Sequence, residues 1–376
     1  MEALILSCST GGGHNAAARA VQEAMTRRGH HAVLMDPYDL VSIRLSRAVG
    51  SGYVRMVQFS PALFGVVYRL GDAYRNLPIP SPVYGVNIAM AGKMEAYLRQ
   101  HHYDVIVCTH VYPAEILTYL RRRGAALPKL LFIATDYTCI PFTEETDCDR
   151  YVIPSPELKD DFLYWGIPAE KLVPTGIPVG DVFQEAGTRK AALQALRLNP
   201  DYRYLLLSGG SLGGGQLQTA AEILAAYLRD HPAYRLIVIC GNNRNLLVQM
   251  RKLYGQNPQI LLLATTNRMA LYMRACDVFL SKPGGLSSTE AAVSGTPLIH
   301  VAPIPGCEDR NLKFFAGHHM SIAVGRQLDR LPEALARLLV PGAAEEMRKN
   351  QRAFIPQRAS DAVCDLAEAL IAGDNS

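Results

Sequence analysis

The sequence predicts an α/β protein built from two doubly wound, Rossmann-like domains. Short, continuous apolar runs alternate with amphipathic helical patterns along all 376 residues. This alternation is typical of parallel sheets that helices cover on both faces. The runs fall into two series, each about the size of one such domain. Proline and glycine punctuate the stretch Pro174–Asp181 between the two series, so we expect the domain boundary there.

Each element follows from its local pattern. In the first domain, residues 1–180, the expected strands are Ala3–Leu6, Ala32–Met35, Val105–Cys108, Lys129–Ala134 and Arg150–Ile153. In the second domain, residues 181–340, they are Tyr204–Leu207, Arg235–Ile239, Gln259–Leu263, Val278–Leu280 and Pro297–His300. The pattern of Asp361–Ala372 indicates a closing amphipathic helix.

Composition excludes several classes of protein. The net charge of +4 is too small to suggest a nucleic-acid binder. The eight cysteines contain no C-x-x-C pair, which favours reduced thiols over a disulfide framework or a zinc site. No apolar run reaches the roughly 18 residues of a membrane span, and the N-terminus lacks the basic start of a signal peptide. We therefore expect a protein that is soluble or lies on a membrane surface.

The segment from Leu40 to Met94 interrupts the alternation and is interpreted as an insertion of about residues 40–94. It is rich in aromatic residues and proline, and Asp72 is its only acidic residue. Its basic residues are Arg44, Arg47, Arg55, Arg69, Arg75 and Lys93. Such a stretch can lie in a membrane interface, where each cation adds about 1 kcal/mol of attraction to an anionic surface. The alternative is a set of core helices with solvated arginines.

A glycine-rich turn follows the first expected strand. Gly11, Gly13 and Ala16 fit the pattern G-x-G-x-x-A, and Asp36 ends the next apolar run. The free N–H groups at such a helix start attract phosphates, so a nicotinamide-dependent oxidoreductase is one interpretation. It explains this loop alone, because a single match of this kind has low specificity.

Two similar loops occur in the second domain, after Leu207 and after Leu280. The first is Ser208-Gly-Gly-Ser-Leu-Gly-Gly-Gly215, and the second is Ser281-Lys-Pro-Gly-Gly-Leu-Ser-Ser-Thr-Glu290. Ser287 or Ser288 is a candidate cap of the helix that follows. The Glu290 carboxylate can accept two hydrogen bonds from a ribose diol. Two such loops and this carboxylate indicate a nucleoside diphosphate site.

These motifs resemble those of a known glycosyltransferase family, which includes plant monogalactosyldiacylglycerol synthase and bacterial processive diacylglycerol glucosyltransferase. The resemblance runs through nearly the whole chain. It rests on Thr10-Gly-Gly-Gly-His14, Thr135-Asp-Tyr137, Gly166-Ile-Pro168, Thr175-Gly-Ile-Pro178, Gly209-Gly-Ser-Leu-Gly213, Thr266-Asn-Arg-Met269, Ser281–Glu290, Gly295-Thr-Pro-Leu298 and Pro303–Asn311. It implies a GT-B fold, in which two Rossmann-like domains face each other across a cleft and C-terminal helices, residues 341–376, pack back on the first domain.

The resemblance also implies a UDP-sugar donor that is held mostly by the second domain. Glu290 is then expected to bind the ribose, the backbone near Thr266 the uracil, and Glu308, Asp309 and Asn311 the sugar. The other donor contacts implied are Gly12, Gly13, Gly210, Ser211, Gly213, Met269, Gly284, Gly285 and Ser287. These enzymes generally need no bound metal, because loop N–H groups and helix dipoles can offset the charge of the leaving diphosphate.

Two residues are candidates for the catalytic base. His14, with an ordinary pKa of about 6.5, suits proton abstraction from the acceptor hydroxyl. Its alternatives are a local hydrogen bond or a contact with the donor phosphate. Asp136 is the other candidate, either as base or to orient the acceptor, and it could also simply cap a helix. With His14 as base, Asp36 becomes a turn residue before Pro37.

Two further features concern metal binding and the identity of the acceptor. Asp147-Cys-Asp149 has the D-x-D spacing that binds metal in other glycosyltransferases, but it precedes a strand, so we interpret it as a solvated loop. The acceptor half departs from the family at Ser9, where plant enzymes have aspartate, at Ile140, where many have histidine, and at Pro141-Phe142, which lacks the usual tryptophan.

The sequence thus predicts an inverting glycosyltransferase that moves a hexose from a UDP-sugar to a membrane lipid, most simply diacylglycerol, to form a β-glycoside. Its expected place is the cytoplasmic face of the membrane, as a peripheral protein. The alternatives are a UDP-sugar epimerase or hydrolase, a nicotinamide oxidoreductase, and a non-catalytic UDP-sugar-binding regulator. The sequence distinguishes neither among glucose, galactose and N-acetylglucosamine nor between one transfer and several.

Overall fold

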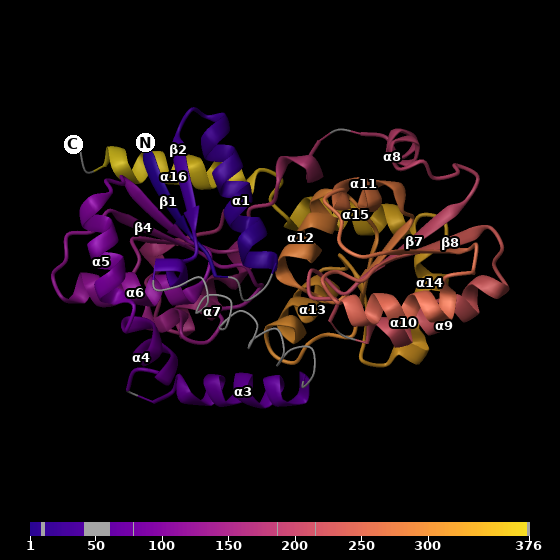
Figure 1. The fold of residues 1–376 in the computed structure, drawn as a ribbon, viewed down its shortest axis with the longest axis horizontal. Coiled ribbons are helices and arrows are strands. Elements are labelled where there is room, and N and C mark those ends of the chain that lie inside the picture. Colours follow the sequence, from indigo (N-terminus) through magenta and orange to yellow (C-terminus); the bar gives the residue numbers. More distant parts are fainter. Residues whose placement is uncertain (9–11, 41–60, 78, 186, 215, 374–376) are drawn as a thin grey trace. The chain divides into compact units, whose positions relative to one another are not determined.

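The computed structural model describes residues 1–8, 12–40, 61–77, 79–185, 187–214 and 216–373. The described chain divides into two compact units (Figure 1). The first unit holds residues 1–40, 62–77, 79–180 and 358–373, and the second holds Pro61 and the residues from Asp181 to Gln357. The chain therefore passes from one unit to the other at Gly180 and returns at Arg358.

The first unit is built on a parallel sheet in the order β2-β1-β3-β4-β5-β6. Its strands are β1 (Glu2–Leu6), β2 (His31–Met35), β3 (Val105–Cys108), β4 (Lys129–Ile133), β5 (Arg150–Val152) and β6 (Leu172–Val173). Its helices are α1 (Gly12–Arg27), α3 (Pro61–Tyr74), α4 (Pro82–Ile88), α5 (Ala91–Gln100), α6 (Val111–Arg122), α7 (Lys159–Tyr164) and α16 (Ala359–Ala372).

Side-chain alternation along β1 divides the core of this unit between the two faces of the sheet. Ala3 and Ile5 pack with apolar residues of α1 and α16. Leu4 and Leu6 point to the opposite face and pack with residues of α5 and α6. Because all four side chains are fully buried, helices cover both faces, as the continuous apolar runs predict.

The second unit has its own parallel sheet, in the order β12-β11-β10-β7-β8-β9. Its strands are β7 (Arg203–Ser208), β8 (Tyr234–Ile239), β9 (Ile260–Leu263), β10 (Val278–Ser281), β11 (Leu298–Val301) and β12 (Ile322–Gly325). Its helices are α8 (Arg189–Leu196), α9 (Leu217–Arg229), α10 (Arg244–Tyr254), α11 (Met269–Ala275), α12 (Gly285–Val293), α13 (Cys307–Gly317), α14 (Leu331–Leu338) and α15 (Ala343–Phe354). This strand order is that of a Rossmann domain.

The predicted fold class is confirmed, and each of the ten predicted strands is present with ends shifted by at most one residue. Two strands were not predicted. β6 has only two residues, too few to give a periodic signal. β12 is only partly buried, and its apolar run of three residues ends in glycine, so its signal is short. The eight cysteines are all unbridged, in agreement with the expectation of free thiols.

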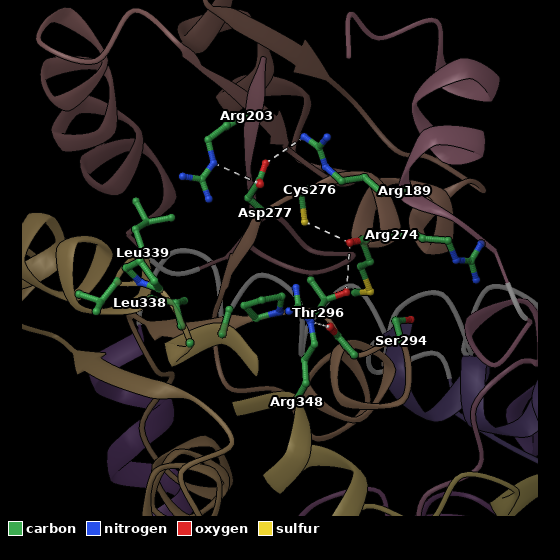
Figure 2. A pocket seen from close by; sticks show the side chains of 17 residues that line it. Arg189, Arg203, Arg274, Cys276, Asp277, Ser294, Thr296, Leu338, Leu339 and Arg348 are labelled. Atoms are coloured by element: carbon green, nitrogen blue, oxygen red, sulfur yellow. Dashed lines mark hydrogen bonds and ion pairs between the residues drawn. The ribbon is translucent and has the colours of Figure 1, made fainter. Parts of the chain in front are cut away.

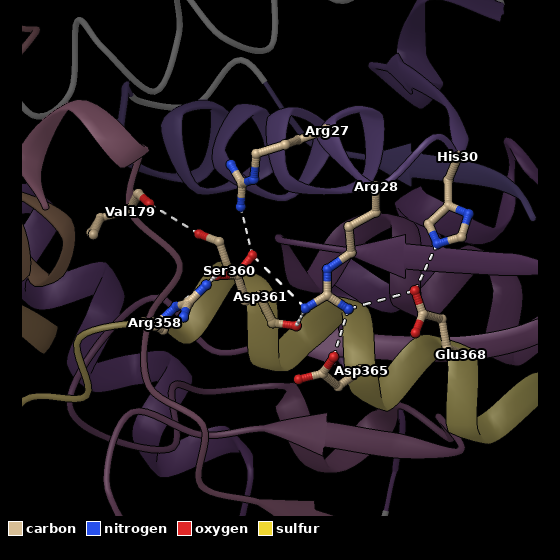
Figure 3. Close-up of polar contacts among 9 residues, drawn as sticks. All are labelled: Arg27, Arg28, His30, Val179, Arg358, Ser360, Asp361, Asp365 and Glu368. Carbon is tan, nitrogen blue, oxygen red and sulfur yellow. Dashed lines mark hydrogen bonds and ion pairs between the residues drawn. The ribbon is translucent and has the colours of Figure 1, made fainter. Parts of the chain in front are cut away.

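A row of polar contacts ties α16 to α1 in the first unit (Figure 3). Arg27, the last residue of α1, and Arg28, which follows it, form ion pairs with Asp361 and Asp365, each at 2.5 Å. His30 lies 2.7 Å from Glu368. The Ser360 hydroxyl donates to the Val179 carbonyl at 2.9 Å, just before the chain leaves the unit. These contacts account for the return of the C-terminal helix.

Residues 341–376 were expected to act as one block on the first domain, and the structure corrects this. α15 belongs to the second unit, where Arg348 donates to the Gly295 carbonyl at 2.9 Å and Gln351 to the Thr296 carbonyl at 3.0 Å. Only the chain from Arg358 onward belongs to the first unit. The proline at position 356 stands between the two helices and ends α15.

The insertion of about residues 40–94 is also divided by the structure. Arg44, Arg47 and Arg55 lie outside the described residues. From Pro82 on, one side of the chain packs into the core: Tyr84, Met90 and Met94 are buried, as the alternative of core helices predicts. No helix within the described ranges combines the length and apolar character needed to cross a bilayer.

Arg75 was counted among the surface cations of this insertion, and that assignment is wrong. Its side chain is fully buried and forms an ion pair with Glu144 at 2.7 Å. It also donates to the Cys139 carbonyl at 3.1 Å, and its guanidinium lies 3.3 Å from the centre of the Trp165 ring. Arg75 therefore attaches the end of α3 to the body of the first unit.

Candidate active site

The loops predicted to bind the donor meet at one edge of the second sheet. The carboxyl ends of parallel strands share an edge, and β7 and β10 are neighbours although β8 and β9 lie between them in sequence. Strand order reverses at this β7–β10 pair, which is where doubly wound sheets bind their ligands. The loops after Ser208 and after Ser281 thus begin side by side, because these two residues are paired in the register.

The loop after β7 requires glycine for steric reasons. A Cβ on Gly209 would lie 2.4 Å from the Gly214 carbonyl oxygen. Gly213 has a φ of +57°, and a Cβ there would lie 2.0 Å from the Cys240 carbonyl oxygen. Because Gly213 is buried, it shapes the loop, whereas Gly210 and Ser211 are accessible at its tip.

Lys282 lies between the two glycine loops, and the sequence reasoning overlooked it. A Cβ on Gly210 would lie 3.2 Å from its Cε, and one on Gly284 would lie 3.5 Å from its Nζ. The ammonium forms an ion pair with Glu308, whose other carboxylate oxygen accepts from the Ile304 N–H at 2.8 Å. A cation inside the motif Ser281-Lys-Pro-Gly-Gly was the available signal, since a diphosphate site needs positive charge.

The residues predicted to contact the sugar have different surroundings. Glu308 is buried against Lys282, and the buried Asn311 side chain donates to the Pro283 carbonyl at 3.0 Å. Both hold the loop after β10 against α13. Asp309 instead accepts from the Gly306 N–H at 3.2 Å and pairs with Arg326 at 2.9 Å. Two of the three are therefore placed at the glycine loop.

The first turns of α12 carry the predicted diphosphate and ribose contacts. The helix begins at Gly285 with Gly284 as its N-cap and no side-chain cap, so the capping role expected of Ser287 or Ser288 is wrong. Ser288 is buried and lies 2.9 Å from His300 instead. Ser287 and Glu290 are three residues apart and half-buried, so they share the face of α12 turned away from the core.

Thr266 and Met269 belong to the loop after β9, at the same edge of the sheet. The Thr266 hydroxyl accepts from the Arg268 N–H at 3.0 Å, which turns the chain into α11. Met269 is the first residue of α11, and both side chains are half-buried. The predicted donor residues of the second domain therefore gather at the carboxyl ends of β7, β9, β10 and β11.

The half predicted to bind the acceptor has an equivalent arrangement in the first unit. Strand order reverses at the neighbours β1 and β3, and β4 lies next to β3. His14, in the first turn of α1, follows β1, and Thr109 and Thr135 lie in the loops after β3 and β4. Of the motif Thr10–His14, the described part begins at Gly12, where α1 also begins, with Gly13 in its first turn.

Contacts from two neighbouring strands fix the His14 ring. Its Nδ1 lies 2.9 Å from the Thr109 carbonyl oxygen and 2.9 Å from the Thr135 hydroxyl. Because a carbonyl can only accept, Nδ1 carries the proton and the neutral ring has its lone pair on Nε2. Burial lowers the pKa of His14 below its ordinary 6.5, against the opposing attraction of Asp136. A neutral imidazole with its lone pair on Nε2 is the form that a general base requires.

His110 is a second residue that the sequence reasoning overlooked. Its ring lies edge-on to the His14 ring, with 4.5 Å between their centres. Its Nδ1 accepts from the Tyr112 N–H at 3.2 Å as the N-cap of α6. Burial and the neighbouring His14 lower its pKa well below the ordinary value. A polar residue two positions after the apolar run Val105–Cys108 was the available signal.

Asp136 and Asp36 each follow a strand of the first sheet, β4 and β2 respectively. Asp136 is half-buried and no helix follows it directly, so it does not cap one. Its charge acts on His14, which links the two candidate bases. The Asp36 carboxylate accepts from the Tyr38 N–H at 3.0 Å, which confirms Asp36 as a turn residue.

Cations hold both carboxylates of the D-x-D sequence. Asp147 forms an ion pair with Lys171 and Asp149 with Arg121, each at 2.7 Å. Asp149 also accepts from the Leu130 N–H at 2.7 Å, and Cys148 between them is buried. This region is therefore a braced turn before β5, and the interpretation as a solvated loop holds only for the partly exposed Asp147.

Two family models match the chain, one for each half. The model of monogalactosyldiacylglycerol (MGDG) synthase matches residues 14–179, and the model of the glycosyltransferase family 28 C-terminal domain matches residues 204–365. The chain belongs to the family of glycosyltransferases that these two models describe. The two matches cover the loops of His14, Asp136 and Glu290, and the enzyme is a UDP-sugar-dependent glycosyltransferase.

Similar proteins support the same assignment along the whole length. The processive diacylglycerol β-glucosyltransferase of Bacillus subtilis (strain 168) is 24% identical over 350 residues, covering 92% of this glycosyltransferase and 89% of the relative. The enzyme of the same name from Bacillus pumilus is 23% identical over 365 residues, covering 96% and 93%.

The solved structures that resemble this glycosyltransferase share its fold. MurG of Acinetobacter baumannii has a TM-score of 0.64 at 16% identity, with 98% of this chain and 99% of that chain covered. A UDP-GlcNAc 2-epimerase from Neisseria meningitidis has the same TM-score at 14% identity, with 97% and 99% covered. Transferases and epimerases thus share this architecture, and the fold alone does not determine the reaction.

Proposed function

We propose that this glycosyltransferase transfers a hexose from a UDP-sugar to diacylglycerol with inversion, forming a β-glycosyl diacylglycerol. The observation that carries the proposal is the His14 ring, whose Nδ1 is held by Thr109 and Thr135 in the half of the chain that matches MGDG synthase. An epimerase has no acceptor hydroxyl to deprotonate. The diacylglycerol acceptor is supported by the relatives of that activity, which match nearly the whole chain.

The proposed reaction is a single displacement. His14 Nε2 takes the proton of the acceptor hydroxyl as that oxygen attacks the anomeric carbon. The bond between this carbon and the phosphate oxygen breaks, and UDP leaves with the electron pair. Lys282 and the N–H groups of the two glycine loops offset the charge of the diphosphate, so we propose that the step needs no metal. Glu290 holds the ribose through its hydroxyls.

A direct assay tests this proposal. The purified protein is mixed with vesicles that contain diacylglycerol and with each UDP-sugar in turn; UDP release is measured, and the extracted lipid is analysed by mass spectrometry. We expect one donor to give a lipid heavier by one or more hexoses. UDP release without such a lipid would assign a different acceptor, and UDP binding without release would favour the regulator.

The rate should depend on pH through His14. Because burial lowers the pKa of His14, its base form persists below pH 6.5, and kcat/KM should fall only on the acid side of that value. The measurement is the pH profile of kcat/KM for the UDP-sugar. A fall near pH 4, the ordinary range of an aspartate, that persists in His14→Gln would instead assign the base to Asp136.

Exposed apolar side chains in the first unit support a membrane-facing surface. Leu70 on α3 is 64% exposed and Val86 on α4 is 66% exposed, and Leu77 and Ile79 between these helices are also exposed. A Cβ on Gly71 would lie 3.3 Å from the Phe142 ring, so α3 packs on the loop where this sequence departs from the family. We therefore propose that this surface lies on the cytoplasmic face of the membrane and admits the lipid near Asp136.

Vesicle binding should combine an apolar and an electrostatic part. We expect Leu70→Ser to weaken binding to anionic vesicles by about threefold to tenfold in a sedimentation assay, because it removes one exposed apolar side chain that the membrane would bury. Leu253→Ser on α10, which removes an equally apolar and exposed side chain of the second unit, is the matched control. Binding should also fall as salt rises. Equal losses in both variants, or binding independent of salt, would contradict the proposed surface.

A further inference from the structure

A cavity lies in the second unit, at the edge of the sheet opposite to the donor loops (Figure 2). Its volume is about 410 Å³. It opens beside Arg203, the first residue of β7, beside Asp277, just before β10, and beside Pro297, just before β11. Because these are amino ends of strands, the four-residue β10 separates the cavity from the glycine loops by roughly 13 Å.

The charge of this cavity is strongly positive. Its lining includes the four arginines Arg189, Arg203, Arg274 and Arg348, and Asp277 is the only acidic residue among them. Glu345, outside the lining, pairs with Arg348 at 3.3 Å and with Arg352 at 3.2 Å. With the carboxylates of Asp277 and Glu345 both counted, positive charges still outnumber negative charges. This excess faces a cavity that is open to solvent.

Neighbouring groups hold two of the guanidinium groups in place. Arg189 and Arg203 pair with the two carboxylate oxygens of Asp277 at 3.1 and 3.3 Å, and Asp277 also accepts from the Tyr204 N–H at 2.8 Å. These pairings leave N–H groups unused: the Arg189 Nε is buried and has no hydrogen-bond partner within the described structure. A buried, unsatisfied donor costs about 1–3 kcal/mol. The Arg189 side chain is 39% exposed and that of Arg203 is 47% exposed, so other parts of both arginines remain accessible.

The remaining walls define the kind of ligand. α15 begins at this cavity with Gly342 as its N-cap and no side-chain cap, so its N-terminal end adds to the positive potential. Leu338, Leu339 and Pro341 line another side with apolar surface. The volume exceeds that of a bare phosphate and lies in the range of organic ligands, about 300–1,000 Å³. Planar guanidinium forks match phosphate oxygens in pairs.

We propose that this cavity binds a phosphate monoester, with the phosphate on Arg189, Arg203 and Arg348 and the organic part against the Leu338–Pro341 wall. The site is separate from the donor loops, so it binds its ligand together with the UDP-sugar. A phosphate monoester occurs both in soluble phosphorylated metabolites and in lipids whose headgroup ends in one. The inference does not depend on the identity of the acceptor.

Calorimetric titration of the full chain with glycerol 3-phosphate tests the site. We expect Arg203→Gln to weaken binding at least fivefold, and Arg189→Gln with Arg203→Gln at least tenfold. Asp277→Asn should instead tighten binding at least threefold, because it removes the competing carboxylate and frees both guanidinium groups. A purely structural ion-pair network predicts no gain in affinity from this substitution. Arg229→Gln, an exposed arginine of α9 away from the cavity, is the matched control.

Two further measurements complete the test. The affinity for UDP should be unchanged in Arg203→Gln and Asp277→Asn, which excludes binding of the probe at the donor loops and shows that the variants fold. Vesicles of neutral lipid with and without a lipid phosphate monoester separate the two sources: stronger capture of the lipid than of glycerol 3-phosphate identifies the lipid, and the reverse identifies the metabolite. Equal binding of glycerol 3-phosphate by the parent protein and all variants, or no binding, would overturn the proposal.

Discussion

His14→Ala is expected to lower turnover at least 100-fold and to leave the affinity for UDP nearly unchanged. General-base catalysis contributes about 10²- to 10⁴-fold, and alanine removes the imidazole that is proposed to take the proton. The ring contacts Thr109 and Thr135 of the first unit, whereas the predicted nucleotide contacts lie mainly in the second. Steady-state kinetics with a fixed donor and equilibrium binding of UDP measure the two effects separately.

Two further variants separate catalysis from structure. Thr135→Val keeps the shape of its side chain but removes one of the two contacts to Nδ1, so it should lower kcat by less than His14→Ala. His101→Ala removes an exposed histidine of the same unit and should leave kcat unchanged. If His14→Ala retains near-parental activity, His14 is not the base, and Asp136 becomes the remaining candidate.

Strand-by-strand periodicity predicted the fold well because both sheets are parallel and buried on both faces. Runs such as Leu205-Leu-Leu207 are fully buried, so their continuous hydrophobicity alone indicates a strand. β6 and β12 carry less of this signal, since one is very short and the other half-exposed. The division at Gln357 and Arg358 was not predictable from periodicity, because α15 and α16 are both amphipathic and only their partners distinguish them.

The site was predictable where a motif carries its own chemistry and was missed where chemistry arises from tertiary contact. Glycine loops and Glu290 are visible in the sequence. The edge-on position of His110 against His14 joins residues 96 positions apart, and only the β1–β3 pairing brings them together. Arg75 illustrates the converse error: composition counted it as a surface cation, but Glu144 and Trp165 bury it.

Glu290→Ala is expected to weaken UDP binding by about 30-fold or more. Glu290 lies on the half-buried face of α12 together with Ser287, one turn from the glycine loop after β10. A carboxylate that accepts two hydrogen bonds from a ribose diol contributes about 1.5–3 kcal/mol for each, and alanine leaves both hydroxyls without a partner. Calorimetric titration of UDP gives the affinity directly.

The pattern across three variants determines what Glu290 does. Glu290→Gln keeps one carbonyl acceptor and should lose less affinity than Glu290→Ala. Glu222→Ala removes an exposed glutamate of α9 in the same unit and should bind UDP like the parent protein. Glu290→Ala should weaken the binding of uridine by the same factor as the binding of UDP, because both ligands carry the ribose. It should not change the binding of free diphosphate. If Glu290→Ala weakened the binding of diphosphate but not of uridine, Glu290 would lie at the phosphates. An unchanged affinity for UDP would remove the donor-site assignment of α12.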